Sequence, residues 1–166
     1  MNLYFLRHAI AVEKEEWRKP ESERPLTDEG IRKMRRVAEG MRALKLSFDW
    51  ILTSPARRAY DTAEIVAKEF KAGQKVRILK SLAPDGDPKI LVKHLALNFR
   101  SWESVLLVGH EPYLSHLISM LLTGEPEPPF ELKKGGLSLL SADSLTYGRC
   151  ARLEWLIQPK QLKKIA

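Results

Sequence analysis

The chain begins with the stretch Leu3-Tyr4-Phe5-Leu6-Arg7-His8, in which four apolar residues run directly into a cationic pair. An unbroken apolar run of this length is typical of a strand buried on both faces of a parallel sheet. Such a strand delivers Arg7 and His8 to the carboxyl edge of the sheet, where open α/β folds bind ligands. An imidazole is a competent nucleophile at neutral pH, and a guanidinium matches the forked geometry of a phosphoryl group. The pair therefore indicates phosphoryl chemistry through a histidine.

Strand-length apolar segments alternate with helical patterns along most of the chain. Strands are expected at residues 3–6, 50–53, 76–79 and 105–108. The first, second and fourth have the composition of buried parallel strands. Apolar residues at helical spacing predict helices over residues 31–44, 59–70, 88–99 and 112–122. Thr27 is placed to cap the first helix, because Asp28 and Glu29 follow it in the favourable first turn. The alternation predicts a three-layer α/β/α sandwich with a mostly parallel central sheet.

The pattern changes after Gly124. Residues 125–129 are rich in proline and are expected to form a loop. Residues 136–142 and 152–157 are predicted to form a strand pair that extends the sheet at one edge. The sequence contains no internal repeat or low-complexity tract, so we expect one domain spanning residues 1–166.

The composition is that of an ordinary soluble globular protein, with 44% hydrophobic and 30% charged residues. No apolar run approaches the ~18 residues that cross a bilayer, and Arg7 and His8 interrupt the first one too early for a signal peptide. Cys150 is the single cysteine, which excludes an intramolecular disulfide and a cysteine metal cage. We expect a cytoplasmic monomer with no membrane association.

The formal net charge of +7 has two possible meanings. A nucleic-acid surface would gather its cations on one face, often with exposed aromatic residues between them. Here the cations are spread along the chain, and the densest group, at residues 32–36, lies on the polar face of a predicted helix. We therefore expect no nucleic-acid partner. A preference for phosphorylated or acidic partners stays open.

Three predicted strands end in residues suited to phosphoryl transfer. The first ends in Arg7 and His8, the second leads to Arg57 and Arg58, and the fourth leads to His110. Because the carboxyl ends of parallel strands share one edge, these side chains are expected to converge. His8 would attack phosphorus while His110, Arg7 and one of the two later arginines hold the phosphoryl oxygens. Water would then hydrolyse the phosphohistidine.

This arrangement needs no metal ion or other cofactor, because fixed cations supply the charge stabilisation. The four histidines of the chain also lack a short metal-ligand spacing such as i, i+4. His94 is expected to be a structural or surface residue. His116, in a predicted apolar helix, is expected to pack or to cap rather than to bind a metal.

An ordered set of short motifs resembles the histidine phosphatase superfamily, and within it the small SixA-like phosphohistidine phosphatases. The motifs cover most of the chain in the family's order. They are Leu6-Arg7-His8-Ala9, Arg24-Pro25-Leu26-Thr27 with Gly30, Ser54-Pro55-Ala56-Arg57-Arg58-Ala59 with Thr62-Ala63, Leu82-Ala83-Pro84-Asp85-Gly86-Asp87, and Gly109-His110. The segment from Trp155 to Lys164 is also similar. The resemblance implies a phosphoglycerate-mutase-like fold.

The resemblance also implies a role for each matching residue. His8 matches the phospho-accepting histidine, and Arg7 and Arg58 match the two phosphate-binding arginines. His110 matches the second pocket histidine, which contacts phosphate and is a candidate cation. Arg24 lies near the pocket mouth in the family, which implies a secondary role in substrate binding.

The sequence departs from the wider superfamily at two places. Ala9 replaces the glycine that often follows the nucleophile. The stretch between Phe70 and Pro88 is too short for the helical insertion that carries a glutamate proton donor in larger members. A mutase or sugar bisphosphatase with a lidded pocket is therefore disfavoured, and Arg57 is expected to face solvent beside the phosphate-binding arginine.

Protonation of the leaving group is the open step of this mechanism. Asp85 or Asp87 is a candidate donor, although the Asp85–Asp87 segment is also the pattern of a turn that begins a helix. Alternatively, the substrate is a phosphohistidine, whose imidazole leaves with little acid catalysis. We expect a phosphatase acting on phosphohistidine in signalling phosphotransfer domains or phosphocarriers. The alternatives are a small phosphomonoester or nucleotide phosphatase and a non-catalytic module that binds phosphoproteins.

Overall fold

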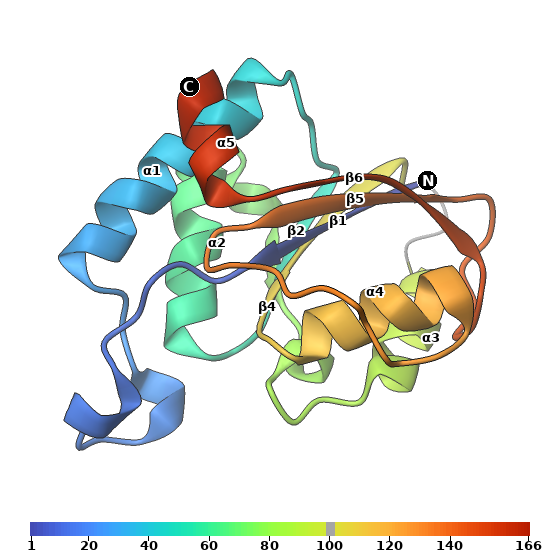
Figure 1. Cartoon of the computed structure of the whole chain (residues 1–166), viewed down its shortest axis with the longest axis horizontal. Coiled ribbons are helices and arrows are strands. Elements are labelled where there is room, and N and C mark those ends of the chain that lie inside the picture. Colours follow the sequence, from blue (N-terminus) through green and yellow to red (C-terminus); the bar gives the residue numbers. More distant parts are fainter. Residues whose placement is uncertain (99–101) are drawn as a thin grey trace.

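The computed structural model describes residues 1–98 and 102–166, and a six-stranded sheet runs through its centre (Figure 1). The strands are β1 Asn2–Arg7, β2 Trp50–Thr53, β3 Val76–Ile78, β4 Ser104–Gly109, β5 Leu137–Ala142 and β6 Ala151–Ile157. They lie in the order β3-β2-β4-β1-β5-β6. The first four in this order run parallel, whereas β5 is antiparallel to β1 and β6 is antiparallel to β5. The sheet thus has a parallel centre and an antiparallel edge.

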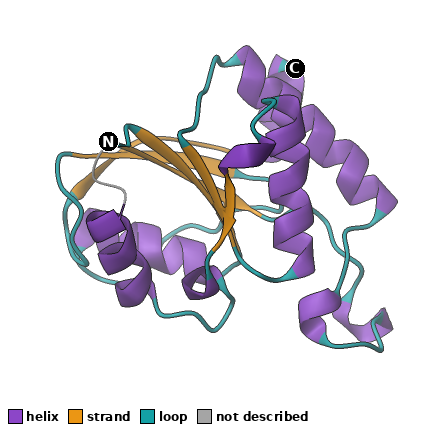
Figure 2. Ribbon diagram, turned by 180° about the vertical axis from the view of Figure 1, so that it is seen from behind, coloured by secondary structure: helices purple, strands orange, loops and turns teal. Residues whose placement is uncertain are grey.

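Helices cover both faces of the sheet (Figure 2). They are α1 Asp28–Ala43, α2 Arg57–Glu69, α3 Pro88–Asn98, α4 Tyr113–Thr123 and α5 Pro159–Ile165. Residues of α1, α2 and α5 share one buried apolar cluster, and residues of α3 and α4 share the other. The side chains of β1 alternate between the two clusters, as a strand's twofold period requires, with Tyr4 and Leu6 on one side and Leu3 and Phe5 on the other. The predicted three-layer sandwich with a mostly parallel sheet is confirmed.

Most predicted elements match the observed ones to within a few residues. The side chain of Thr27 caps α1 by accepting the backbone N–H of Gly30 at 2.9 Å, as its position predicted. The predicted pair at residues 136–142 and 152–157 forms the sheet edge as β5 and β6. The predicted third helix extends to Phe99, which lies outside the described residues. None of the described helices is both long enough and apolar enough to span a bilayer.

Helix α5 was not among the helices predicted from apolar spacing. It has seven residues and buries one of them, Leu162, so it carries no repeating apolar stripe. Its start at Pro159, a residue favoured at the first helical position, was the available signal. The helix packs closely on α1, since a Cβ added at Gly40 would lie 2.1 Å from the Leu162 carbonyl oxygen.

The sheet brings the ends of its three central strands together at one edge. Arg7 pairs with Gly109, and the pairing continues past the strands where the His8 N–H donates to the Gly109 carbonyl at 2.9 Å. The Ser54 N–H likewise donates to the Val108 carbonyl at 3.1 Å. These bonds fix the backbone after β1, β2 and β4 relative to one another. The residues that follow the three strands therefore occupy set positions at the carboxyl edge.

Candidate active site

Three side chains from three different elements meet at the carboxyl edge of the sheet. His8 follows β1, Arg58 lies in the first turn of α2, and His110 follows β4. All three are buried, with 6%, 4% and 2% of their surface exposed. The ring centroids of His8 and His110 are 5.1 Å apart, and Nε of Arg58 is 3.3 Å from Nε2 of His8. The structure thus places two imidazoles and a guanidinium in direct proximity.

The hydrogen bonds of His8 define which ring nitrogen carries the proton. Nδ1 lies 2.7 Å from the Ala9 carbonyl oxygen, which can only accept, so Nδ1 holds the hydrogen. Nε2 then presents a lone pair, which accepts from the Arg58 Nε–H. Burial lowers the pKa of His8 to about 2, with the charges of His110, Arg58 and Arg7 acting in the same direction and the Ala9 bond opposing them. The ring is therefore neutral and nucleophilic at pH 7.

His110 is held by the serine that follows β2. Its Nε2 lies 2.8 Å from Oγ of Ser54, a hydroxyl that can donate or accept. Burial lowers the pKa of His110 to about 3, with the charges of Arg58 and Arg24 next in importance, so the ring is neutral at pH 7. Its Nδ1 is buried without a hydrogen-bond partner among the described residues. A buried orphan nitrogen is costly, which suits a position where a polar ligand binds.

Arg7 is anchored by the segment that precedes β5. Its Nη1 donates to Oε1 of Glu131 and to the carbonyl of Leu132, both at 2.7 Å. The Leu132 N–H is itself held by the carboxylate of Glu111 at 3.2 Å. Nε of Arg7 is buried without a partner in the part of the chain that the structure describes. The side chain is thus fixed at one end and retains an unsatisfied donor at the other.

A carboxylate that the sequence did not single out joins two of the arginines. The Glu21 carboxylate accepts hydrogen bonds from Nε and Nη2 of Arg24 at 2.8–3.1 Å. Its Oε1 also lies 3.3 Å from Nη1 of Arg58. The hydrogen bonds from Arg24 hold the pKa of Glu21 below its usual value, so it stays ionised at neutral pH. Arg24 is therefore joined to Arg58 through Glu21, which contacts both. The i, i+3 spacing of Glu21 and Arg24 was the available but weak signal.

Thr62 connects the segment of His8 to helix α2. The Thr62 hydroxyl accepts the Ala9 N–H at 3.0 Å and donates to the Arg58 carbonyl at 2.6 Å. The residue is fully buried. It is part of the family motif, but its spacing in the sequence did not predict these two hydrogen bonds.

The remaining sequence candidates are separated by the structure. Arg57 is exposed and pairs with Asp61 at 3.5 Å, as expected for the solvent-facing neighbour. Asp87 directly precedes α3, and its Oδ1 accepts the Lys89 N–H at 2.7 Å. Asp85 instead lines a cavity of about 390 Å³ together with Arg58 and Glu21. Of the two aspartates, Asp85 is the one that lines the same cavity as Arg58.

The expectation that His116 packs or caps was wrong. His116 is exposed on α4, because its position lies opposite the buried residues Leu114, Leu117 and Ile118 of that helix. It lines a shallow cavity with Arg7 and others. No group of three or more His, Cys, Asp and Glu side chains within residues 1–98 and 102–166 is placed to hold a metal ion.

Comparison with known proteins identifies the family. The family model of the histidine phosphatase superfamily (branch 1) matches residues 3–83, which include His8, Arg24 and Arg58. An uncharacterised protein of Picosynechococcus is 34% identical over 142 residues, or 82% of each chain. The phosphohistidine phosphatase SixA of Escherichia coli is 28% identical over 164 residues, which cover 98% of this chain and 97% of SixA.

The chain belongs to the histidine phosphatase superfamily. The solved structure of the protein histidine phosphatase SixA complexed with tungstate superposes with a TM-score of 0.85 at 27% identity, covering 98% of this chain and 99% of that one. As in the sequence expectation for a small SixA-like member, the described segment between α2 and α3 holds β3 and two short 3-10 turns, with no helical insertion. The phosphoglycerate-mutase-like fold of this superfamily is therefore present in its small form.

Proposed function

We propose that this phosphatase removes phosphate from phosphohistidine in proteins through a covalent intermediate on His8, without a metal ion. The observation that carries the proposal is the tautomer of His8. Its Nδ1–H is held by the Ala9 carbonyl, so the Nε2 lone pair lies beside the Arg58 guanidinium. A neutral imidazole next to a fixed cation is suited to attack an anionic phosphoryl group.

The proposed reaction has two displacement steps at phosphorus. In the first, Nε2 of His8 forms a bond to phosphorus while the bond to the substrate's imidazole nitrogen breaks. The electron pair stays on that nitrogen, and the ring, which carries a proton on its other nitrogen, leaves as neutral imidazole. In the second, water attacks phosphorus, the bond to Nε2 breaks, and inorganic phosphate is released. Arg7, Arg58 and His110 hold the phosphoryl oxygens in both steps. Bound phosphoryl oxygens would accept hydrogen bonds from Nε of Arg7 and Nδ1 of His110, which otherwise have no partner among the described residues.

The supply of protons favours phosphohistidine as the substrate. An alkoxide leaving group needs a strong general acid, whereas an imidazole leaves as a much weaker base. Glu21 is ionised, and Asp87 is engaged at the start of α3, so neither is suited to donate a proton. A cavity bordered by the exposed residues Pro84 and Asp85 also leaves room for a histidine on a protein surface. A phosphotransfer domain or phosphocarrier fits this description.

A second candidate function is hydrolysis of small phosphomonoesters or nucleotides. The position of Asp85 in the same cavity as Arg58 favours it, because a carboxyl group there is placed to protonate an ester oxygen. In that case Asp85→Asn would lower ester hydrolysis strongly. Turnover of phosphohistidine, which needs little acid catalysis, would change much less.

The deciding experiment compares phosphate release from a histidine-phosphorylated carrier domain and from p-nitrophenyl phosphate. His8→Ala is tested against His94→Ala, a histidine substitution on α3 outside the cluster. We expect rapid release from the carrier, slow release from the ester, and loss of both only in His8→Ala. Faster ester hydrolysis would favour the second function. If the protein binds the carrier but releases no phosphate in a His8-dependent way, the proposed catalytic function is overturned. The protein would then be a phosphoprotein-binding module.

A further inference from the structure

A second concave surface, which we name the basic groove, lies next to the candidate site. It is a cavity of about 350 Å³ bounded by α1, the backbone after β1, the turn before β5, and α5. Helices α1 and α5, which form part of its wall, lie side by side (Figure 1). Five lysines line it, namely Lys33, Lys133, Lys134, Lys160 and Lys163. These lysines come from three separate parts of the chain, so only the fold brings them together.

The positive charge of the basic groove is poorly balanced. No carboxylate is among the residues that line it. Lys33 pairs with Glu29 at 2.5 Å and Lys134 pairs with Glu13 at 3.7 Å. Lys133, Lys160 and Lys163 make no ion pair with any described residue. Gathering like charges in a concavity destabilises the protein alone and raises the local concentration of anionic partners.

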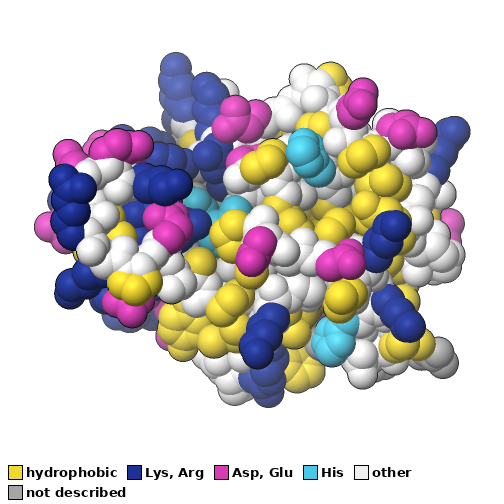
Figure 3. Space-filling view, turned by 90° about the horizontal axis from the view of Figure 1, so that it is seen from below, with side chains coloured by type: hydrophobic (Ala, Val, Ile, Leu, Met, Phe, Trp, Pro, Cys, Tyr) yellow, Lys and Arg dark blue, Asp and Glu magenta, His cyan; other side chains and the backbone are white. Residues whose placement is uncertain are grey.

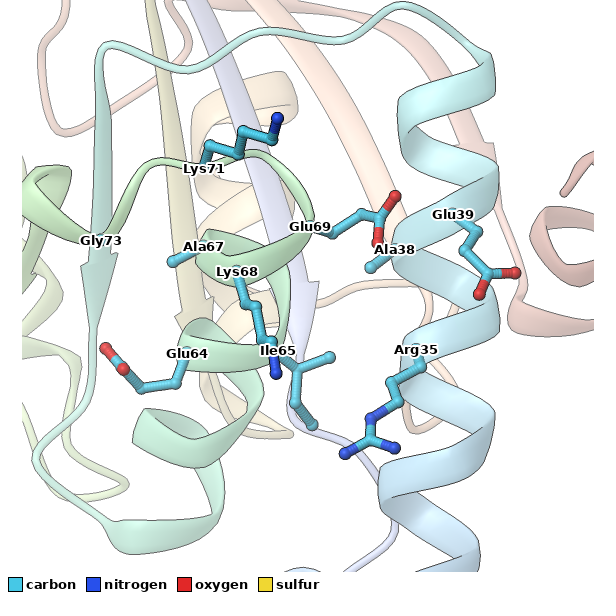
Figure 4. Close-up of a pocket in the computed structure, with 10 residues that line it drawn as sticks. All are labelled: Arg35, Ala38, Glu39, Glu64, Ile65, Ala67, Lys68, Glu69, Lys71 and Gly73. Atoms are coloured by element: carbon cyan, nitrogen blue, oxygen red, sulfur yellow. The ribbon is translucent and has the colours of Figure 1, made fainter.

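Another cavity does not share this imbalance. A cavity of about 690 Å³ between α1 and α2 is lined by charges of both signs (Figure 4). Its carboxylates, Glu39, Glu64 and Glu69, lie among Arg35, Lys68 and Lys71 (Figure 4). An acidic ligand gains little from such a mixed surface. The space-filling view likewise shows Lys and Arg side chains mixed with Asp and Glu over much of one face (Figure 3).

The floor of the basic groove is apolar. Ile10 after β1 and Pro159 of α5 are its partly exposed apolar residues, Met34 and Val37 of α1 are buried there, and no aromatic side chain lines it. A nucleic acid would find no stacking surface here. A polypeptide that combines acidic side chains with an apolar one matches both the lysine rim and the floor.

The basic groove borders the candidate site at two residues. Arg7 and Ala9 both line it. Arg7 is one of the proposed phosphate ligands, and the Ala9 carbonyl holds Nδ1 of His8. A chain segment bound in the groove would therefore emerge beside the nucleophile.

We propose that the basic groove binds an acidic segment of the protein that carries the phosphohistidine, in a position next to the phosphorylated residue. This proposal rests on the proposed function, because it names the feature by which the same site recognises a protein substrate. The lysines add affinity and speed of encounter, whereas the chemistry stays with His8.

The test uses two synthetic phosphohistidine peptides and free phosphohistidine as substrates at low ionic strength. One peptide carries Asp and Glu around the phosphohistidine, and the other carries Asn and Gln at the same positions. The test variant is the double substitution Lys160→Glu with Lys163→Glu. Its matched control, Lys68→Glu with Lys93→Glu, lies on exposed positions of α2 and α3. Each double variant changes the formal net charge from +7 to +3, since each substitution changes it by two.

We expect the wild type to hydrolyse the acidic peptide with about tenfold higher kcat/KM than the neutral peptide. Lys160→Glu with Lys163→Glu should abolish this preference and leave free phosphohistidine unchanged, while the control keeps the preference. Equal losses in both doubles would overturn the proposal in favour of long-range steering. A parallel loss with free phosphohistidine would also overturn it, because the substitution would then have damaged the site.

Binding of a fluorescein-labelled, unphosphorylated acidic peptide separates this proposal from the proposed function. If no substrate shows His8-dependent phosphate release, the proposed function fails. Peptide binding that Lys160→Glu with Lys163→Glu weakens would still support the groove. If a single-stranded oligonucleotide displaces the labelled peptide more strongly than the unlabelled acidic peptide does, the proposal that the basic groove binds an acidic peptide is overturned.

Discussion

Nε of Arg58 donates to Nε2 of His8 across 3.3 Å, so the guanidinium faces the lone pair that the proposed reaction uses. The contact keeps the imidazole in the tautomer with Nδ1 protonated. When a phosphoryl group approaches Nε2, the same N–H must turn to a phosphoryl oxygen, because the lone pair is then engaged with phosphorus. In the proposed reaction Arg58 would thus hold the nucleophile first and the transferred group afterwards.

The first prediction concerns the two adjacent arginines. Arg58→Ala should lower kcat/KM for a phosphohistidine substrate by about 100-fold, as expected for losing one donor to a transition-state oxyanion. Arg57→Ala should stay within about twofold, because Arg57 is exposed and pairs with Asp61. Steady-state kinetics of the two variants, with thermal unfolding to verify the fold, provide the measurement. Similar losses in both would contradict the assignment of Arg58.

The second prediction concerns stability below neutral pH. The pKa of His8 is lowered to about 2 and that of His110 to about 3, whereas an unfolded histidine has a pKa of about 6.5. Below pH 6.5 the unfolded chain takes up protons that these folded rings do not, so stability present above pH 6.5 is lost as pH falls. Each ring should cost about 2 kcal/mol between pH 7 and pH 5.

Urea unfolding at the two pH values measures this effect. His8→Asn should remove one ring's share of the pH dependence, whatever its effect on stability at pH 7. His94→Asn is the control, since its ring lies outside the buried cluster. An unchanged pH dependence in His8→Asn would show that the ring of His8 is protonated in the folded state.

The parallel part of the fold was predictable from sequence because its signals are local. The strand ending at Leu6 is an unbroken apolar run, and Thr27 is a cap followed by two acidic residues. Once the strands are parallel, topology alone carries His8 and His110 to one edge. Helix α5 was missed because Leu162 is its one buried anchor, which leaves no period to detect.

The parts of the site that sequence did not predict depend on contacts between distant segments. Glu21 lies in a charged stretch with many similar residues, and only the folded loop brings it to Arg58. Glu131 reaches Arg7 from a proline-rich loop far along the chain. His116 has an apolar neighbourhood in sequence, yet its side chain falls on the exposed face of α4. The spacing of residue types does not fix the contacts of Glu21 and Glu131, whereas the exposure of His116 follows from the helical spacing of the buried residues around it.

The third prediction concerns competition between Glu131 and substrate for Arg7. The Glu131 carboxylate accepts from Nη1 of Arg7, yet its side chain is 69% exposed and can move away at little cost. Leu132 also accepts from Nη1, so Arg7 keeps an anchor without Glu131. Glu131→Gln should therefore tighten inhibition by inorganic phosphate by about two- to fivefold.

The control for this prediction is Glu127→Gln, which changes the net charge equally in the same loop. Inhibition constants for phosphate, measured with free phosphohistidine as substrate, distinguish the two. Weaker phosphate binding in Glu131→Gln would show that the carboxylate positions Arg7 instead of competing for it.

The fourth prediction concerns Thr62, whose hydroxyl ties the nucleophile's segment to α2. Thr62→Val keeps the shape of the side chain but leaves the buried Ala9 N–H without its partner at 3.0 Å. An unsatisfied buried donor costs about 1–3 kcal/mol, so the free energy of unfolding should fall by that amount. Thr62→Ser keeps the hydroxyl and should lose less than Thr62→Val.

Activity should also depend on the hydroxyl. The Ala9 carbonyl orients His8, and the Thr62 hydroxyl holds both the Ala9 N–H and the Arg58 carbonyl. If Ala9 is held less firmly, His8 is oriented less well, so kcat should fall in Thr62→Val. KM for free phosphohistidine should change little. Chemical denaturation and steady-state kinetics of Thr62→Val and Thr62→Ser test both effects. Equal stability losses in the two variants would contradict this role of the hydrogen bond, because Thr62→Ser keeps the hydroxyl and loses only the methyl group.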